Sequence, residues 1–295
     1  MAGATATVST GLAINGSQFC FLRIQDLSQF SYVDPNGQIM CGSLDHYAVR
    51  VSTGPEVYRF KVLMAPHPGE LDVLLPLMGW NEDSTDTFTP TDTETTFTSL
   101  IRRKSSTNTT HSYTGCKIAK AVMRWQYGAS PMTLELDIVA TGFSEGSTFS
   151  PSAITLQGPY TIYHSALTLR ATSTAYGQGV IVWDRHMKPR YNNTVAASVY
   201  QSVQRTLHLG VETPYTDDED DILTTFIGAS RNSTIAANVN FTNGTKRLIW
   251  DIPGVVWEAT PPSILNKEND VRMYQFYKAL RTTGNPLATI TQDNT

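Results

Sequence analysis

Residues 70–79 read Glu-Leu-Asp-Val-Leu-Leu-Pro-Leu-Met-Gly, and residues 219–228 read Glu-Asp-Asp-Ile-Leu-Thr-Thr-Phe-Ile-Gly. Residue 219 lies 149 positions after residue 70, and Glu, Asp, Leu and Gly recur at the same offsets. Apolar residues at i, i+1, i+4 and i+5 form one stripe along a helix, and a terminal glycine suits a helix end. We therefore predict two equivalent short helices. Pro76 predicts that the first helix stops near Leu75, because proline lacks the amide proton.

The similarity continues upstream of both helices. Residues 58–62 alternate apolar and basic side chains, and residues 207–211 alternate apolar side chains with His and Gly. Alternation of this kind is typical of a half-buried strand. A match without a gap over strand, loop and helix predicts an internal duplication.

The length and composition indicate the fold class. A chain of 295 residues is long enough for two domains of about 150 residues each. We predict a mainly β protein with two similar antiparallel β-sandwich or open-barrel domains, each with about seven strands and one short helix. The first domain covers residues 1–148 and begins with an N-terminal arm of small and polar residues over 1–17. The second covers residues 149–295, and a Ser- and Gly-rich linker over 143–158 joins them.

The sequence also predicts the local structure of several shorter segments. Gly54-Pro55 is predicted to be a turn between two strands, and residues 26–44 a hairpin or long loop around Asp34-Pro-Asn-Gly37. Residues 113–117 are predicted to be a turn that enters a strand, and residues 184–191 a basic and aromatic loop. The predicted strands are 19–24, 46–53, 56–63, 97–103, 117–127, 133–139, 166–170, 179–183, 203–211, 249–257 and 271–280.

The stretch 81–99 is rich in Thr and contains five acids, no base and almost no aliphatic residue. Such a composition buries little apolar surface, which predicts a solvated loop. Long loops in compact domains often have a function, so a docking segment is the alternative.

Charge and targeting signals limit the function classes. The net charge is −4 and the pI is about 5.9, which does not favour tight nucleic-acid binding. Residues 1–7 have no basic or apolar signal-peptide region, and no apolar run has the roughly 20 residues of a membrane span. The cysteines are odd in number and sparse, which predicts buried thiols. They are Cys20, Cys41 and Cys116.

No catalytic pattern is present. The six His residues are scattered, and no Ser lies in a G-x-S-x-G motif. Cys116 beside Lys117 has no His base near it in sequence, which favours the turn over an activated thiol. Asp217–Asp221 lacks the spacing of a calcium loop, and acids there suit a helix N-terminus. We therefore predict no enzyme activity, no cofactor, and no catalytic, cofactor-binding or metal-binding residue.

The tryptophans allow two interpretations. Four of them lie in predicted strands, which predicts core positions. A sugar-binding platform is the alternative and would require them on one exposed face. The four are Trp125, Trp183, Trp250 and Trp257.

The order of these segments resembles a known family. A strand pair precedes a short helix that ends in Met78-Gly79, and an acidic insertion follows it. Tyr113-Thr-Gly-Cys-Lys117 then leads into a strand, and Met132-Thr-Leu-Glu-Leu-Asp-Ile-Val139 closes the first half. This order is similar to that of the tail tube proteins of long-tailed bacteriophages. The similarity covers most of the chain, with two tube-like domains in one polypeptide.

The resemblance implies a structural virion protein. Tube domains form rings around a lumen, and stacked rings form the hollow conduit for genome delivery. A duplicated subunit implies a pseudo-sixfold ring of three copies, favoured over six. The implied partners are further copies and the tail terminator, tape-measure and tail-tip or baseplate proteins, with assembly in the host cytoplasm and no membrane. Segments 1–17, 26–44 and 81–99 are expected to gain order from neighbouring subunits.

Charge pairing leads to an expectation about DNA. Lys117, Lys120 and Arg124 precede a strand that carries Glu135 and Asp137, so cross-strand pairing is predicted to neutralise the bases. The resulting lumen wall is net negative or mixed, and we expect DNA to pass without tight binding. Two other function classes stay open. One is another virion β-protein, such as a capsid decoration or baseplate component, and the other is a carbohydrate-binding or hydrolytic β-sandwich.

Overall fold

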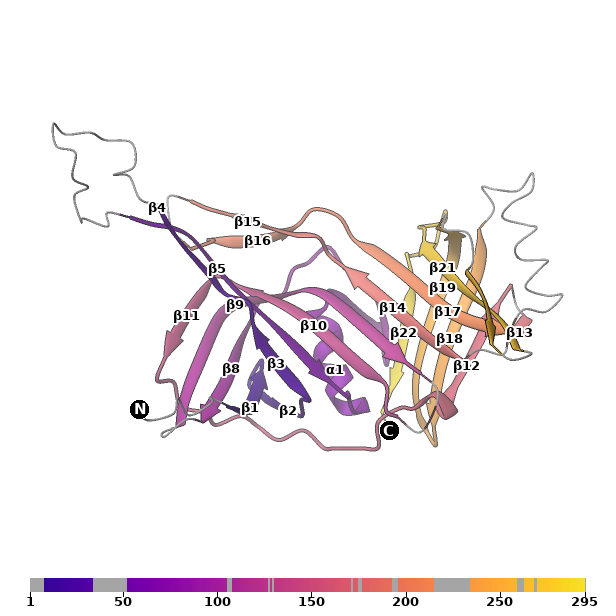
Figure 1. Ribbon diagram of the computed structural model, residues 1–295, viewed down its shortest axis with the longest axis horizontal. Coiled ribbons are helices and arrows are strands. Elements are labelled where there is room, and N and C mark those ends of the chain that lie inside the picture. The colour runs from indigo at the N-terminus through magenta and orange to yellow at the C-terminus, as the bar shows by residue number, and fades with distance from the viewer. Residues whose placement is uncertain are drawn as a thin grey trace.

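The computed structural model describes residues 8–33, 52–104, 108–126, 128, 130–170, 172–174, 177–192, 196–214, 234–258, 263–267 and 270–294. The described chain is mainly β, with antiparallel sheets that do not close into a barrel (Figure 1). The mainly β prediction is confirmed. The predicted helix at 219–228 and most of 26–44 lie outside the described residues. The internal duplication and the division at residue 148 therefore stay predictions.

The first half of the chain forms two sheets with a helix, α1 (Pro68–Leu77), packed beside them. One sheet contains β3 (Arg23–Asp26), β5 (Ser52–Met64), β10 (Thr133–Ala140) and the second part of β9 (Asn108–Trp125). The other contains β1 (Val8–Ile14), β2 (Ser17–Phe19), β8 (Phe97–Lys104), β11 (Gly142–Glu145) and the first part of β9. A further strand, β4 (Gln29–Val33), pairs with the start of β5.

The second half also contains two sheets. The first is β14 (Gln178–Asp184), β17 (Thr206–Pro214), β21 (Asp270–Ala279) and β20 (Ser263–Lys267). The second is β13 (Thr172–Thr174), β12 (Ser165–Leu169), β18 (Ile235–Asn243), β19 (Lys246–Trp257) and β22 (Thr289–Asp293). Two strands of the first half, β7 (Thr87–Pro90) and β6 (Trp80–Ser84), extend it beyond β22. A 3-10 turn, η2 (Ile162–His164), precedes β12, and β15 (Met187–Arg190) pairs with β16 (Val199–Ser202).

The predicted first helix is present, and a buried carboxylate fixes its start. Glu70 is fully buried, and its two oxygens accept hydrogen bonds from the backbone amides of His67 and Cys20, each at 2.9 Å. The prediction that Pro76 ends the helix near Leu75 is wrong, because α1 continues through Leu77. A proline in the last turn removes only one helical hydrogen bond, and the amide of Met78 still donates to Leu74 at 2.9 Å.

Two predicted turns and the bounds of one predicted strand are wrong. Gly54-Pro55 lies inside β5, where a bulge in the β4–β5 pairing tolerates a residue without an amide proton. Residues 113–117 lie within β9 rather than in a turn before it. Gly115 has φ +59 there, and an added Cβ would lie 2.1 Å from the Thr141 hydroxyl. The predicted strand 19–24 is divided between β2 and β3.

Three predicted loops contain regular structure. Residues 81–90 of the acidic stretch belong to the β6–β7 hairpin, and residues 187–190 form β15, so neither stretch is only a loop. The linker also pairs with the body, since β11 pairs with β9 and Ser152 accepts a hydrogen bond from the Gln18 amide at 2.8 Å. The sequence did not predict these strands because most of their side chains are polar. Only a few of their positions, such as Phe88, are apolar and buried.

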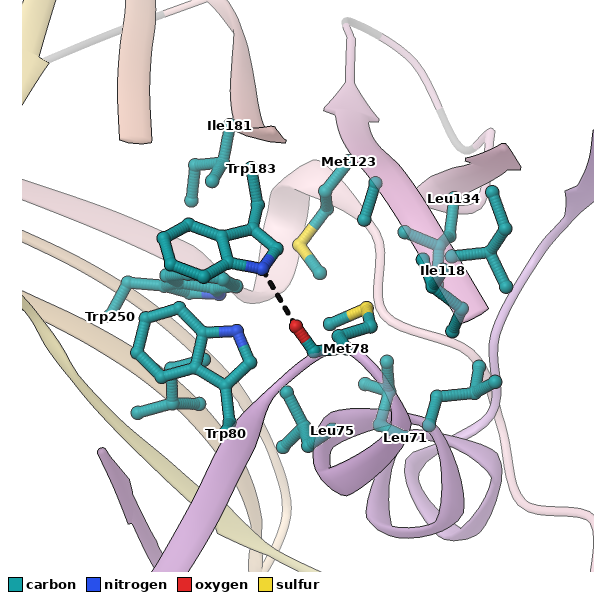
Figure 2. Close-up of a cluster of buried hydrophobic side chains, with 14 of the residues drawn as sticks. Leu71, Leu75, Met78, Trp80, Ile118, Met123, Leu134, Ile181, Trp183 and Trp250 are labelled. Atoms are coloured by element: carbon teal, nitrogen blue, oxygen red, sulfur yellow. Dashed lines mark hydrogen bonds between the residues drawn. The ribbon is translucent and has the colours of Figure 1, made fainter. Parts of the chain in front are cut away.

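A cluster of tryptophans joins the two halves in one core (Figure 2). The rings of Trp80 and Trp183 lie 4.9 Å apart between centroids, and Trp250 meets Trp80 edge-on at 5.4 Å. The indole nitrogen of Trp183 donates to the Met78 carbonyl at the end of α1 at 2.8 Å. The core is therefore continuous across the predicted linker. No helix in the described part of the chain is long and apolar enough to cross a membrane.

Asp72 on α1 makes stability depend on pH. Burial, followed by the nearby carboxylates of Asp86, Glu82 and Asp293, raises the pKa of Asp72 from 3.8 to about 7. A carboxyl with a raised pKa in the folded state stabilises the fold when protonated, and this contribution is lost as the pH rises through about 7. The change Asp72→Asn mimics the protonated form at every pH.

We expect Asp72→Asn to raise the free energy of unfolding at pH 8 by about 1 kcal/mol, a value reduced for solvent screening. Below about pH 4 the gain should vanish. Urea unfolding of both proteins at the two pH values measures this difference. Asp251→Asn, at an exposed position on β19, is the control. A gain that is equal at both pH values would contradict the assignment to Asp72 ionisation.

Candidate functional site

Eight strands from both halves form one continuous antiparallel layer, which we call the long sheet. Its order is β3–β5–β10–β9–β14–β17–β21–β20. The halves meet where β9 pairs with β14, and Trp125 lies opposite Gly179. A Cβ at Gly179 would lie 2.3 Å from the Trp125 ring, so this junction requires glycine. Among the described residues, the outer edges of β3 and β20 pair with no further strand.

The two faces of the long sheet differ in character. One face carries buried apolar side chains, such as Phe60, Leu136 and Ile181, and packs on the core. The opposite face, which we call the outer face, carries mostly polar and charged side chains. Alternation along each strand separates the two sets, because successive side chains of a strand point to opposite faces.

Opposite charges pair across strands on the outer face. These pairs are Arg59–Asp137, Lys61–Glu135 at 3.3 Å, Arg124–Glu135 at 3.9 Å and Lys120–Asp184 at 3.7 Å. Since each base lies beside an acid, the face has a mixed charge instead of a single sign. The partly exposed pairs of Lys61, Lys120 and Arg124 contribute little to stability, but the pairing weakens attraction to phosphates.

The predicted cross-strand pairing is correct in part. Arg124 lies beside Glu135 as predicted. Lys120 instead pairs with Asp184 of β14, and Asp137 pairs with Arg59 of β5. A register shift in β10 between Asp137 and Ile138 also separates Lys117 from the acids of β10.

The β15–β16 pair, which we call the arm, covers one end of the outer face. Ala197 and Tyr200 are buried there against Val139 of β10. The arm is fixed at its base, because the ammonium group of Lys117 donates to the Tyr200 carbonyl at 2.6 Å. The other end of the outer face stays open and leads to the β9–β10 connection.

A network of buried charges lies beneath the arm. The Glu94 carboxylate forms an ion pair with Lys117 and accepts a hydrogen bond from the Ser202 amide at 2.7 Å. Arg185, which is 2% exposed, lies 3.9 Å from Glu94 and points to the Leu77 carbonyl at the end of α1 at 3.4 Å. The network therefore joins the acidic stretch to both halves, and the interpretation of 81–99 as a solvated loop is wrong.

Burial and pairing determine the protonation of this network. Burial raises the pKa of Glu94, but hydrogen bonds from Lys117 and Ser202 outweigh it and leave the pKa below its ordinary value. Burial lowers the pKa of Arg185, and the charge of Glu94 opposes that shift. Glu94 is therefore ionised at neutral pH, where it compensates two buried cations.

A polar pocket of about 840 Å³ opens beside this network. Residues from four separate parts of the chain line the pocket, so the sequence gave no indication of it. Its charged lining residues are Asp92, Glu94, Arg185, Arg205 and Arg281. Arg205 donates to the Thr91 carbonyl at 2.6 Å and forms an ion pair with Asp92.

The remaining candidates for chemistry have structural positions. Trp125, Trp183 and Trp250 are each at most 2% exposed, so they form no exposed platform for sugars. Cys116 is buried, and burial raises the pKa of its thiol to about 12. Cys20 is exposed, which makes the prediction of a buried thiol wrong at that position. Cys41 and Asp217–Asp221 lie outside the described residues.

Neither metal-binding side chains nor similarity to known proteins assigns a function to this chain. Across the residues that the structure describes, no group of three or more His, Cys, Asp or Glu side chains is placed to hold a metal ion. No protein-family model and no curated protein matches the chain.

Proposed function

We propose that this protein is the subunit of a bacteriophage tail tube, the hollow conduit for genome delivery. The observation that supports the proposal is the long sheet, in which eight strands from both halves form one layer with a packed face and a charged face. A sheet with these two faces suits the wall of a water-filled channel. The order of segments that resembles tail tube proteins agrees with this arrangement.

The free edges of the long sheet suit ring formation. An unpaired edge offers amide and carbonyl groups to another strand, and β3 and β20 are the two ends of the layer. When β20 of one copy pairs with β3 of the next, the wall continues from copy to copy. This contact is heterologous, and the ring closes when the rotation between copies completes a circle. Three copies would supply 3 × 8 strands in a pseudo-sixfold ring, which we favour over a ring of six copies.

The mixed charge of the outer face suits transport of DNA. Each phosphate held by a free Lys or Arg adds affinity through counterion release. On the outer face Arg59, Lys61, Lys120 and Arg124 each lie beside an acid. A duplex would therefore slide past this wall without tight binding. In the virion the tube would contact the tail terminator, the tape-measure protein and the tail-tip or baseplate proteins.

Electron microscopy of the purified protein at high concentration tests the proposal. We expect hollow tubes of constant diameter, built from stacked rings. Leu22, which precedes β3 and is 61% exposed, lies at a free edge of the long sheet. The change Leu22→Asp should prevent tube formation while the circular dichroism spectrum stays unchanged. Leu156→Asp, at a position that is 55% exposed and belongs to no strand of the long sheet, is the matched control.

The outcome separates the function classes. Small closed oligomers would instead favour a capsid decoration or baseplate component, and monomers that bind glycans would favour a carbohydrate-binding module. Tubes should also show no measurable affinity for duplex DNA at physiological salt. A salt-dependent dissociation constant below about 1 μM would contradict a passive conduit.

A further inference from the structure

The polar pocket brings together three arginines from separate elements. Arg185 follows β14, Arg205 precedes β17, and Arg281 follows β21. The two acids of the pocket are already engaged, since Asp92 pairs with Arg205, and Glu94 with Lys117 and Ser202. Positive charge is therefore left over at this site.

Arg185 is buried without a complete set of partners. Its Nε atom has no hydrogen-bond partner among the described residues. Its Nη1 atom lies 3.4 Å from two backbone carbonyls, and its Nη2 atom lies 3.9 Å from Glu94, so no contact is short. A buried guanidinium is unfavourable unless acceptors satisfy it, and a bidentate carboxylate is its best partner.

Arg281 also has capacity for a ligand. It is exposed and has no hydrogen-bond or ion-pair partner among the described residues. A pocket of about 840 Å³ lies in the size range of ligand-binding pockets. The chemistry that fits the three arginines is a peptide with several carboxylates in sequence.

We propose that this pocket binds the acidic stretch Asp217–Asp221 of a second copy of the chain. That stretch reads Asp-Asp-Glu-Asp-Asp and is the densest run of acids in the sequence. It follows β17, which ends at Pro214. The proposal rests on the proposed function, because it names a contact between neighbouring subunits of the tube.

The acidic stretch as a whole cannot reach the pocket of its own copy. Strand β17 begins beside the pocket at Thr206 and runs to Pro214, which at about 3.3 Å per residue places its end roughly 26 Å away. From Pro214, a chain of at most about 3.5 Å per residue reaches roughly 10 Å at Asp217 and 25 Å at Asp221. Only the last acids of the run therefore come near their own pocket, and only with the chain fully extended.

A second copy has no such restriction. The pocket lies beside the start of β17, and the acidic stretch follows the end of β17 in the sequence, so we infer that the stretch of one copy meets the pocket of the next in a head-to-tail contact. Contacts between two different surfaces leave one free surface of each kind at the ends, and they therefore add further copies without limit unless they close into a ring. This polarity is what a growing tube requires.

A binding experiment tests the pocket directly. The probe is a fluorescein-labelled peptide of residues 214–223, and its anisotropy is measured with the full-length protein under conditions that keep the protein dilute. We expect saturable binding that weakens with salt. The change Arg281→Glu should weaken it at least about tenfold, as expected for the loss of a charge-assisted hydrogen bond. Arg247→Glu, at an exposed arginine on β19 outside the pocket, should leave binding unchanged.

A charge exchange between copies completes the test. A chain with Asp217→Lys, Asp218→Lys and Asp220→Lys should fail to associate with itself but should associate with the Arg281→Glu chain. Peptide binding that Arg281→Glu does not change would overturn the proposal, as would equal binding of a peptide whose acids are amides. Tubes that form without peptide binding would overturn this contact and leave the tube function standing. Peptide binding without tubes would support this contact and overturn the tube function.

Discussion

Replacing Glu94 with alanine is expected to lower the free energy of unfolding by about 3–5 kcal/mol, the usual cost of removing one partner of a buried ion pair. The carboxylate compensates Lys117 and Arg185, whose side chains are 5% and 2% exposed. Without it both cations stay buried beneath the arm, with backbone carbonyls as their main acceptors. Urea unfolding followed by circular dichroism measures the change.

Asp92 offers a matched control two residues earlier. It forms an ion pair with Arg205, but its side chain is 95% exposed. Water therefore screens the pair, and Asp92→Ala should cost less than about 1 kcal/mol. If the two alanine variants lose similar, small amounts of stability, the account of Glu94 as the centre of a buried network is wrong. Deletion of residues 86–94 would remove Glu94 as well and is therefore expected to unfold the chain.

The change Trp183→Ala is expected to cost about 3–5 kcal/mol, because it leaves a large cavity in the core. Trp183 is 1% exposed, its ring packs against the tilted ring of Trp80, and its indole nitrogen donates to the carbonyl of Met78. Trp183→Phe should recover most of the loss, because an aromatic ring still fills most of the cavity. The loss that remains should reflect the missing hydrogen bond to Met78. Thermal unfolding of the three proteins measures this order.

Trp257 provides the comparison on the same kind of element. It lies at the end of β19, is only half-buried, and packs at the margin of the core. Trp257→Ala should cost clearly less than Trp183→Ala, because less apolar surface becomes exposed. Equal losses at the two positions would contradict a central role of the tryptophan cluster that joins the halves.

The successful predictions rest on local patterns. Residues 58–62 and 133–139 alternate in polarity, and residues 179–183 form a short apolar run; all three segments lie in strands with a buried apolar face. The helix that starts near Glu70 was predictable because its apolar stripe and terminal glycine are local signals. The strands β6, β7 and β15 gave no such signal, because neighbouring strands supply most of their stabilising contacts.

The candidate sites were less predictable than the strands. The sequence predicted that Lys117, Lys120 and Arg124 pair with Glu135 and Asp137 across strands, and this was correct for Arg124 alone. It indicated nothing about Arg185 or Glu94, which lie 91 positions apart and appear in the sequence as ordinary loop residues. Only the packing of β9 against β14 and of the arm on β10 brings them together.

The sequence by itself determined the class of the fold, because alternation and the helical stripe depend on neighbours a few positions away. It also determined the low net charge and the run of acids at 217–221. Tertiary structure alone decided the order of the strands in the long sheet, the partners of each charge and the position of the polar pocket. These depend on contacts between residues far apart in the chain, whose geometry is set by packing of the whole core and leaves no periodic trace in the sequence.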